Sequence, residues 1–355
     1  DNVLAALARI VRDMGRPLDL VRVTGRAEDS GQLSGLPVRI VARARAVDFA
    51  AGRGAVVGAT LYAALPFAER APFDRVVFDE AAQVPVPHAL CALLAGPRWL
   101  FFGDDRQLGP VVVGEHDDAS AGASIFAHLR TAAEPTLLDE TYRMNRSVCA
   151  FPSRAFYEGR LQPADGAADR RFDAGDAAGP FAEILDPERG AVLVLIDHEG
   201  YHQLCPPEVR AVADIAEELL ARRGLPAGEL AVVAPFRVQN REIARELRRR
   251  LPADAPLPVI DTVERMQGQE REVVIASLTC SDPDALRRNT AFFFSPNRLC
   301  VTLTRSRTKL IVVGSRLLLS TFPRDHEGLR RLDLFFRLFQ ELPKVNWTDR
   351  YVERA

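Results

Sequence analysis

Lysine is almost absent from this chain of 355 residues. Of its 46 basic residues only Lys309 and Lys344 are lysines, and the other 44 are arginines. A biased genomic base composition is the simplest explanation, because alanine, glycine and proline are also plentiful. The scarcity of lysine is nonetheless useful. For any motif that requires a lysine, only the sequences around these two residues have to be checked.

Other features are missing as well. No apolar run approaches the roughly 20 residues that a membrane-spanning helix needs, and no basic segment followed by an apolar one forms a secretory leader. The net charge is −2, so any binding of nucleic acid must use local clusters of arginine instead of a basic field over the whole molecule. These absences favour a soluble cytoplasmic protein without a membrane partner.

The cysteines form no C-x-x-C pair. Most lie in apolar stretches, which is typical of reduced core residues and not of a zinc site or a disulfide framework. There are five of them, namely Cys91, Cys149, Cys205, Cys280 and Cys300.

Strand and helix signals alternate throughout, in a chain long enough for two domains of about 150 residues each. Fully apolar strands that alternate with helices indicate an α/β fold with parallel sheets covered on both faces. A segment rich in Ala, Gly, Asp and Pro, from about 163 to 190, is predicted to divide two such sets. Ligands of these sheets bind at the carboxyl ends of the strands, and the polar or small residues at or just beyond predicted ends are Asp79, Asp104, Pro235, Thr262 and Gly314.

The segment "VVFDEAAQ" (76–83) ends an apolar strand in two adjacent carboxylates, Asp79 and Glu80. A hard cation such as magnesium is commonly held by one carboxylate together with phosphate oxygens, and a second carboxylate can then take a proton from an attacking water. A solvated Asp-Glu pair at the start of a helix is the alternative for the dipeptide taken alone.

Two later segments carry groups suited to phosphate. "GDDRQLGPV" (103–111) offers Gln107 just past another predicted strand, where its amide can orient water or contact a phosphate oxygen. "TYRMN" (141–145) places Arg143 beside Tyr142, and the guanidinium fork suits phosphate oxygens. Taken alone, each is equally compatible with an ordinary polar turn or a solvated arginine.

Two more segments follow near the end of the chain. "DTVERMQGQE" (261–270) runs from a strand into a polar turn whose Gly268 and Glu270 suit a ribose or a phosphate. "NRLCVTLTRSRTKLIVVG" (297–314) presents several arginines, Arg305 among them, which can stabilise charge on a transferring phosphoryl group. A simple turn and a solvated helix face are the alternatives.

In this order the segments resemble superfamily 1 helicases of the Upf-like and DNA-replication-helicase-like group. "VVFDEAAQ" is similar to motif II of that family, "GDDRQLGPV" to motif III and "LDETYRMNRSVCAFPSRAFYEGRL" to motif IV. "DTVERMQGQEREVVIAS" and "NRLCVTLTRSRTKLIVVG" resemble motifs V and VI, while "DNVLAAL" and "GAT" (58–60) resemble the end of motif Ia and motif Ic. The resemblance covers residues 1 to about 315.

The resemblance implies two RecA-like domains with ATP and Mg²⁺ in the cleft between them. Asp79 would hold the magnesium ion, Glu80 would activate water, and Gln107 would sense the terminal phosphate. Arg143 and Arg305 would reach that phosphate from the second domain, so we expect both to matter for turnover more than for folding.

The remaining implied contacts are of two kinds. Tyr142, Gly268 and Glu270 would meet the nucleotide, while Thr60 and Thr262 would touch the backbone of a single nucleic-acid strand. Small departures from the family pattern are Cys300 and Ser306, which stand where this group often has Asn and Ala.

One family motif is missing. The phosphate loop G-x-x-x-x-G-K-[ST] needs a lysine before a hydroxyl residue, whereas Lys309 precedes Leu310 and Lys344 precedes Val345. We therefore expect a piece cut from a longer protein, in three parts: a partial first RecA-like domain (1–135), a second RecA-like domain (136–320) and a C-terminal tail (321–355).

The sequence thus predicts the motor core of an ATP-dependent helicase that moves on single-stranded DNA or RNA, as a monomer and, by resemblance, from 5′ to 3′. Two alternatives remain open. One is a nucleic-acid-stimulated ATPase that remodels protein–nucleic-acid complexes without unwinding. The other is a nucleic-acid-binding fragment without catalytic activity, if the phosphate loop is naturally absent.

Overall fold

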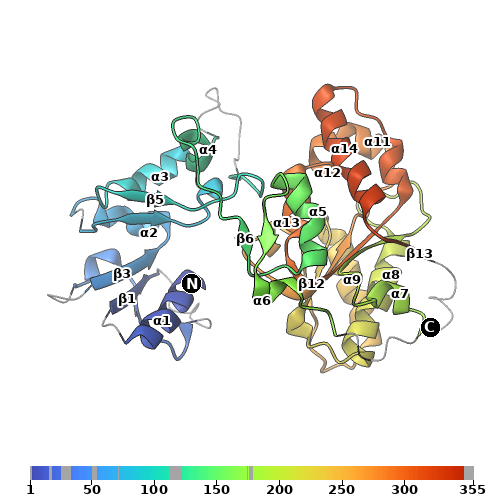
Figure 1. Cartoon of the computed structure of the whole chain (residues 1–355), viewed down its shortest axis with the longest axis horizontal. Coiled ribbons are helices and arrows are strands. Elements are labelled where there is room, and N and C mark those ends of the chain that lie inside the picture. Colours follow the sequence, from blue (N-terminus) through green and yellow to red (C-terminus); the bar gives the residue numbers. More distant parts are fainter. Residues whose placement is uncertain are drawn as a thin grey trace. The chain divides into compact units, whose positions relative to one another are not determined.

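The computed structural model describes residues 2–15, 18–24, 33–49, 54–70, 72–111, 122–173, 175 and 179–347. The chain divides into two compact units (Figure 1). The first comprises residues 1–105 and 109–135, and the second comprises residues 106–108 and 136–355. Each unit is described by itself below.

The first unit opens with an amphipathic helix and a small parallel sheet. Helix α1 (Asn2–Met14) buries Leu4, Ala5 and Ala8, and separations of one, three and four residues keep them on one helical face. Leu4 and Ala5 pack against the sheet formed by β2 (Val38–Val41), β1 (Leu18–Val23) and β3 (Gly54–Ala59), in that order and all parallel.

A second, two-stranded sheet follows in the same unit. Strands β4 (Val76–Phe78) and β5 (Trp99–Phe101) pair in parallel, and the rings of Phe78 and Phe101 stack with centroids 4.8 Å apart. Helix α3 (Val86–Leu93) and helix α4 (Ile125–Leu129) cover the face that carries Phe78. Short helix α2 (Leu61–Ala64) follows β3.

The second unit is built on a six-stranded sheet in which every neighbouring pair is parallel. The strand order is β10-β9-β11-β12-β8-β13. In chain order the strands are β8 (Ala191–Leu195), β9 (Leu230–Val233), β10 (Val259–Asp261), β11 (Arg271–Ser277), β12 (Ser306–Gly314) and β13 (Lys344–Asn346). Their β-branched and leucine residues form continuous apolar runs, as expected for a parallel sheet that is covered on both faces.

The two faces of this sheet have separate cores. Leu193, Val274 and Val312 point to one face, which is packed by α5 (Arg146–Phe156), α13 (Pro296–Leu303) and α14 (His326–Glu341). Val194, Ile275 and Ile311 point to the other, which is packed by α8 (Pro206–Glu217) and α9 (Arg237–Arg250) (Figure 1). The alternation follows from the two-residue period of a strand.

Shorter elements complete the second unit. They are β6 (Glu140–Thr141) and β7 (Gln162–Pro163), which pair in parallel, and the helices α6 (Asp165–Ala168), α7 (Ala182–Leu185), α10 (Val263–Met266), α11 (Pro283–Arg288) and α12 (Thr290–Phe293). Helix α8 continues into a π-helical turn at Glu218–Arg222.

Two expectations about organisation are wrong. The segment from 163 to 190 does not divide the two sets of strands, because Phe172, Ile184 and Leu185 are buried in the core of the second unit. Within the predicted tail, the described residues 321–347 are not separate either. Helix α14 covers one face of the large sheet, and β13 pairs with β8 at its edge.

The structure bears on two predictions from the sequence, that the chain has no membrane-spanning helix and that its cysteines are reduced. Among the residues that the structure describes, no helix is both long enough and apolar enough to cross a membrane. All five cysteines are free thiols, as predicted, and four are buried. Burial raises the pKa of Cys149 and of Cys280 to about 11, so both remain protonated at neutral pH.

Candidate functional site

In the first unit, acidic residues follow the ends of two paired parallel strands. Asp79 and Glu80 come directly after β4, and Asp104 follows β5. The two loops lie close together, because the Ala81 N–H donates to the Phe102 carbonyl at 2.7 Å. A Cβ atom at position 103 would lie 2.8 Å from the Ala82 nitrogen, so this approach requires Gly103.

Glu80 has a strained backbone. Its φ of 52° and ψ of 39° lie in the left-handed region, which non-glycine residues rarely adopt. The Glu80 N–H donates to Asp79 Oδ1 at 3.1 Å, and Gln83 Nε2 donates to Glu80 Oε2 at 3.0 Å. Strain of this kind costs on the order of 1–3 kcal/mol and is concentrated at functional sites. The backbone turn after β4 thus fixes the position of the Glu80 carboxylate.

Asp79 fits the magnesium role predicted for it. Its carboxylate is exposed at the carboxyl end of β4, and one oxygen already accepts the Glu80 N–H. Carboxylate oxygens are the hard ligands that Mg²⁺ prefers, and one carboxylate is enough when phosphates supply the rest. The donor chemistry of the two loop ends therefore fits a Mg²⁺–phosphate ligand.

In the second unit, hydrogen bonds join four of the predicted site residues in a row. Arg305 donates to Gln107 Oε1 at 2.8 Å and to Thr304 Oγ1 at 3.1 Å. Arg143 donates to the Thr304 carbonyl at 2.9 Å and, through Nε, to Glu270 Oε2 at 2.9 Å. These residues come from segments up to 198 positions apart in the chain. The residues predicted from motifs III, IV, V and VI are therefore physically connected, and we call them the arginine row.

The row continues into a cluster of acidic residues. Arg307 contacts Glu270 at 3.5 Å and Glu272 at 3.0 Å, and it also pairs with Glu229. Partial burial alone would raise the pKa of Glu270, but the hydrogen bond and charge of Arg143, helped by Arg307, outweigh it and lower that pKa. Glu270 is therefore held as a carboxylate between two guanidinium groups.

Arg305 is far less accessible than we expected for a group that reaches out to phosphate. It is 2% exposed, and its Nε donates to the Val301 carbonyl at 3.1 Å. A buried, hydrogen-bonded guanidinium stabilises the fold, in addition to any contact that it makes with a ligand. This burial gives Arg305 a structural role, which argues against the expectation that it matters for turnover more than for folding.

Tyr142 and Gly268 lie at the surface of the same unit. Tyr142 is 75% exposed, and its hydroxyl donates to Glu140 Oε2 at 2.7 Å, which together with the carboxylate charge raises the pKa of the phenol. Gly268 has a φ of 74° in the turn before β11. The contacts predicted for Tyr142 and Gly268 with the nucleotide stay predictions.

Both threonines predicted to touch a nucleic-acid strand begin short helices. Thr60 precedes α2 and accepts the Ala63 N–H through its hydroxyl at 3.4 Å, which is an N-cap role. Thr262 precedes α10, directly after β10, and its N–H donates to Asp261 Oδ1 at 2.8 Å. In each case the helix start holds the threonine at the carboxyl end of a parallel strand.

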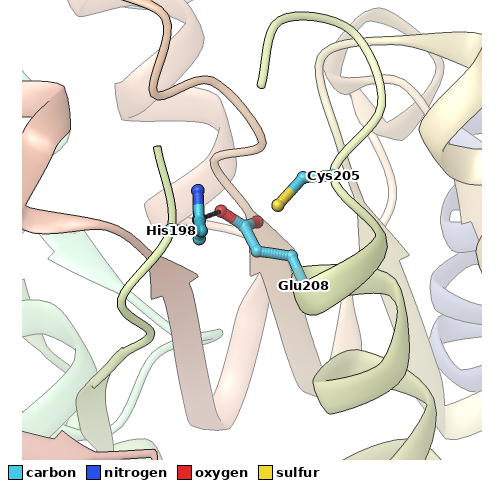
Figure 2. A group of neighbouring side chains, drawn as sticks. All are labelled: His198, Cys205 and Glu208. Carbon is cyan, nitrogen blue, oxygen red and sulfur yellow. Dashed lines mark hydrogen bonds and ion pairs between the residues drawn. The ribbon is translucent and has the colours of Figure 1, made fainter. Parts of the chain in front are cut away.

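A buried polar network was missed from the sequence. His198 follows β8, while Cys205 and Glu208 lie at the start of α8 (Figure 2). His198 Nε2 and Glu208 Oε1 are 2.8 Å apart, and the other His198 nitrogen lies 2.9 Å from Ser281 Oγ. A carboxylate three residues into a helix is common in sequences, so nothing marked this one as buried.

This network holds a strained turn. Glu208 Oε2 accepts from the Ser277 hydroxyl and, at 2.9 Å, from the Thr279 N–H. Thr279 has a φ of 66°, which is unusual for a β-branched residue. Both Glu208 oxygens are thus satisfied by protein donors, which explains the burial of this carboxylate without a metal ion, although His198, Cys205 and Glu208 are close enough together to hold one.

Comparison with known proteins identifies the family. A family profile described as "AAA domain" matches residues 121–317, more than half of the chain. Among curated proteins, the chain is 29% identical over 270 residues to human "3'-5' exoribonuclease HELZ2", covering 70% of this chain and 9% of that protein. It is 26% identical over 253 residues to "Helicase SEN1" of Saccharomyces cerevisiae, covering 68% of this chain and 11% of that protein.

The chain therefore spans about a tenth of the length of these two relatives. Among solved structures, "The structure of PRRSV helicase" aligns with 90% of this chain and 53% of its own, with 16% identity and a TM-score of 0.43. The family profile, the order of the motifs and the relatives named as helicases agree with one another. The chain belongs to this AAA-domain family, within the Upf1-like group of superfamily 1 helicases.

Proposed function

We propose that this chain is the motor part of an ATP-dependent helicase that moves along single-stranded DNA or RNA. The observation that carries the proposal is the arginine row, in which Gln107, Arg305, Arg143 and Glu270 are joined by hydrogen bonds. Four residues selected from four separate sequence motifs would not be expected to connect if the motif resemblance were accidental.

The predicted site residues of each unit would have different roles toward a nucleotide. Asp79 would coordinate Mg²⁺, which when bound neutralises phosphate charge. Glu80, held in its left-handed conformation, would take a proton from the attacking water. Arg143 would stabilise the charge that develops on the phosphoryl oxygens, with Gln107 and Arg305 responding to the terminal phosphate. Glu270, kept ionised between Arg143 and Arg307, would accept a hydroxyl of the ribose.

Thr60 and Thr262 would contact the nucleic-acid backbone. Contacts of this kind position a strand without reading its sequence. With a net charge of −2, the affinity would depend on a few local arginines and would fall steeply with salt concentration. We propose a monomeric motor in the cytoplasm, with 5′ to 3′ movement inferred from the family resemblance.

Turnover would also need a phosphate loop, which these 355 residues do not contain. The loop contributes backbone N–H groups around the phosphates and a lysine at the β and γ positions. We expect the chain by itself to bind single strands but to hydrolyse ATP far more slowly than a helicase. A protein that carries both this chain and the loop should show hydrolysis stimulated by single-stranded nucleic acid.

The test uses Glu80→Gln in that loop-containing protein. ATP binding should be retained, and stimulated hydrolysis should fall by on the order of 10²-fold or more, because the general base is removed. Glu69→Gln is a matched control, since Glu69 is an exposed carboxylate of the same unit that pairs with Arg45. Hydrolysis by Glu80→Gln at the rate of the control would remove Glu80 from the role. Strand-displacement assays would then separate unwinding from remodelling without unwinding.

A further inference from the structure

The second unit contains a cavity that the proposed roles do not use. It lies at the carboxyl ends of β9 and β11, where Ala234, Pro235 and Leu278 form part of its wall. Its volume is about 60 Å³, which is more than one water molecule needs. The lining is mainly apolar, so the cavity suits a flat, weakly hydrated group better than it suits an ion.

Two members of a stack of three planar groups, Phe292 and Arg298, line the cavity. The rings of Phe236 and Phe292 are stacked with centroids 5.3 Å apart and an interplanar angle of 28°. The guanidinium carbon of Arg298 lies 3.9 Å from the centroid of the Phe292 ring. Phe293 adds an edge-on ring, 5.3 Å from Phe292 and at 84° to it. Phe292, Phe293 and Arg298 all line the cavity.

Arg298 is fixed in this position from its other side. Its Nε and one terminal nitrogen both contact Glu264 Oε1, at 2.9 and 2.8 Å. Glu264 lies on α10, and Arg298 lies on α13. The guanidinium plane is therefore oriented in advance, which reduces the entropy lost when a ligand stacks on it.

The cavity is next to the predicted path of the nucleic-acid strand. Val263 lines it and directly follows Thr262, the residue predicted to contact the strand backbone. Arg237 is exposed at the start of α9, directly after Phe236. A strand whose backbone passes Thr262 would therefore have an aromatic cavity and cationic side chains beside it.

We propose that this cavity receives one base of the single strand, with Phe293 and the Arg298 plane as its stacking partners. The proposal rests on the nucleic-acid binding proposed above and extends it from backbone contacts to a base contact. Aromatic rings and arginine planes stack on any base, because every base has a π-face. The contact would therefore strengthen binding without selecting one sequence. Arginine at the rim matches the negative charge of the adjoining phosphates.

The test compares two labelled 20-residue probes by fluorescence anisotropy with the chain as it stands. One is oligodeoxythymidine, and the other has the same sugar–phosphate length but no bases. A base contact predicts that the first probe binds roughly tenfold more tightly at a fixed salt concentration. An oligouridine probe repeats the comparison for RNA.

Variants locate the contact. Phe293→Leu keeps an apolar side chain but removes the ring, so it should lose most of the advantage of the base-bearing probe and leave binding of the abasic probe unchanged. Phe293→Tyr keeps the aromatic ring and should therefore retain the advantage of the base-bearing probe. Phe322→Leu is the matched control, because Phe322 is an exposed phenylalanine of the same unit that does not line the cavity.

The outcomes separate the two proposals. No binding of either probe at low salt would overturn the proposed nucleic-acid function itself. Equal binding of the two probes, or an unchanged advantage in Phe293→Leu, would overturn the base contact and leave the backbone contacts standing. An equal loss for both probes in Phe293→Leu, together with a lowered melting temperature, would assign the ring a structural role and would also overturn the base contact.

Discussion

The two units cover their parallel strands to very different extents. In the second unit, β9 and the stretch of β12 from Thr308 to Gly314 are buried along their whole length, with helices on both faces of the sheet. In the first unit, Val77 of β4 and Leu100 of β5 lie directly opposite each other and are 57% and 47% exposed. Parallel strands thus occur with two covered faces in the large sheet of the second unit and with one covered face in the β4–β5 sheet of the first.

An apolar strand sequence therefore indicates a position that needs to be covered, but it does not provide the element that covers it. Val77 and Leu100 have the composition of core residues, yet no described element packs on their face strongly enough to bury them. A sheet needs several paired strands and packing to be stable by itself. We therefore expect the first unit to open more readily than the second.

Native-state hydrogen exchange should show the largest difference between the units. Amide protons of β11 and β12 should exchange only through global opening of the second unit, whereas those of β4 and β5 should exchange through a local opening. We expect protection to differ by on the order of 10³-fold, about 4 kcal/mol. Equal protection of β4 and β11, measured by mass spectrometry of peptides, would contradict the expectation that the first unit opens more readily than the second.

Glu208→Ala should destabilise the second unit by about 3–5 kcal/mol, because it leaves buried donors on His198, Ser277 and Thr279 without their acceptor. Chemical denaturation followed by a probe in that unit measures the change. Glu242→Ala is the control: Glu242 pairs with Arg245 at the surface, and its loss should cost less than about 1 kcal/mol. If the two variants were equally stable, the buried network would not support the turn after β11.

Lys309 should make the stability of the second unit depend on pH. Burial lowers its pKa to about 7, from an ordinary value of 10.5, although its amine donates to the Asp186 and Arg189 carbonyls. Between these values the unfolded chain binds a proton that the folded unit does not, so the free energy of unfolding rises with pH, by about 1.4 kcal/mol per unit.

The variant Lys309→Met isolates the contribution of Lys309 to the pH dependence. Other groups that titrate in this range are present in the variant and in the unaltered chain, so their contributions cancel in the difference. The difference in stability between Lys309→Met and the unaltered chain should shrink as the pH rises from about 7 towards 10. Lys344→Met serves as the control, since Lys344 is exposed and should leave the slope unchanged. A constant difference across this range would mean that Lys309 stays charged in the folded unit.

The smallest expected effect concerns the strained turn of the first unit. Within a helix or a strand, a protein with glycine at a given position is normally less stable than one with alanine there, by roughly 0.5–1 kcal/mol. At position 80, with its φ of 52°, we expect Glu80→Gly to be more stable than Glu80→Ala by about 1 kcal/mol. The same pair of substitutions at Glu327, in the first turn of α14, should show the ordinary order. The ordinary order at position 80 would mean that the turn relaxes in solution.

Strong local patterns let the sequence predict much of the fold. The segment "LDLVRV" (18–23), which is rich in leucine and valine, forms strand β1. Apolar runs such as "LAVV" are long enough to mark buried strands, and they predicted a parallel α/β fold correctly. The division of the chain was harder, because 163–190 has the composition of a linker although Ile184 and Leu185 are buried.

The site was predicted in part, for a related reason. Motif order selected Gln107, Arg143, Glu270 and Arg305, and these are the residues that the arginine row connects. The burial of Arg305 was not predictable, because a sequence does not say which of its arginine side chains other residues cover. The Phe236–Phe292–Arg298 stack was missed because it joins three elements that have no common periodicity.

The scarcity of lysine has a practical consequence for anyone who handles this protein. Of the two side-chain amines, that of Lys309 is buried in β12 and donates to two carbonyls, while Lys344 is exposed at the start of β13 and donates to the Gln340 carbonyl. An amine-reactive dye should therefore mark a single side chain of the folded second unit, at the edge strand β13. That mark would report on opening of the sheet edge in single-molecule measurements, without any cysteine being introduced or removed.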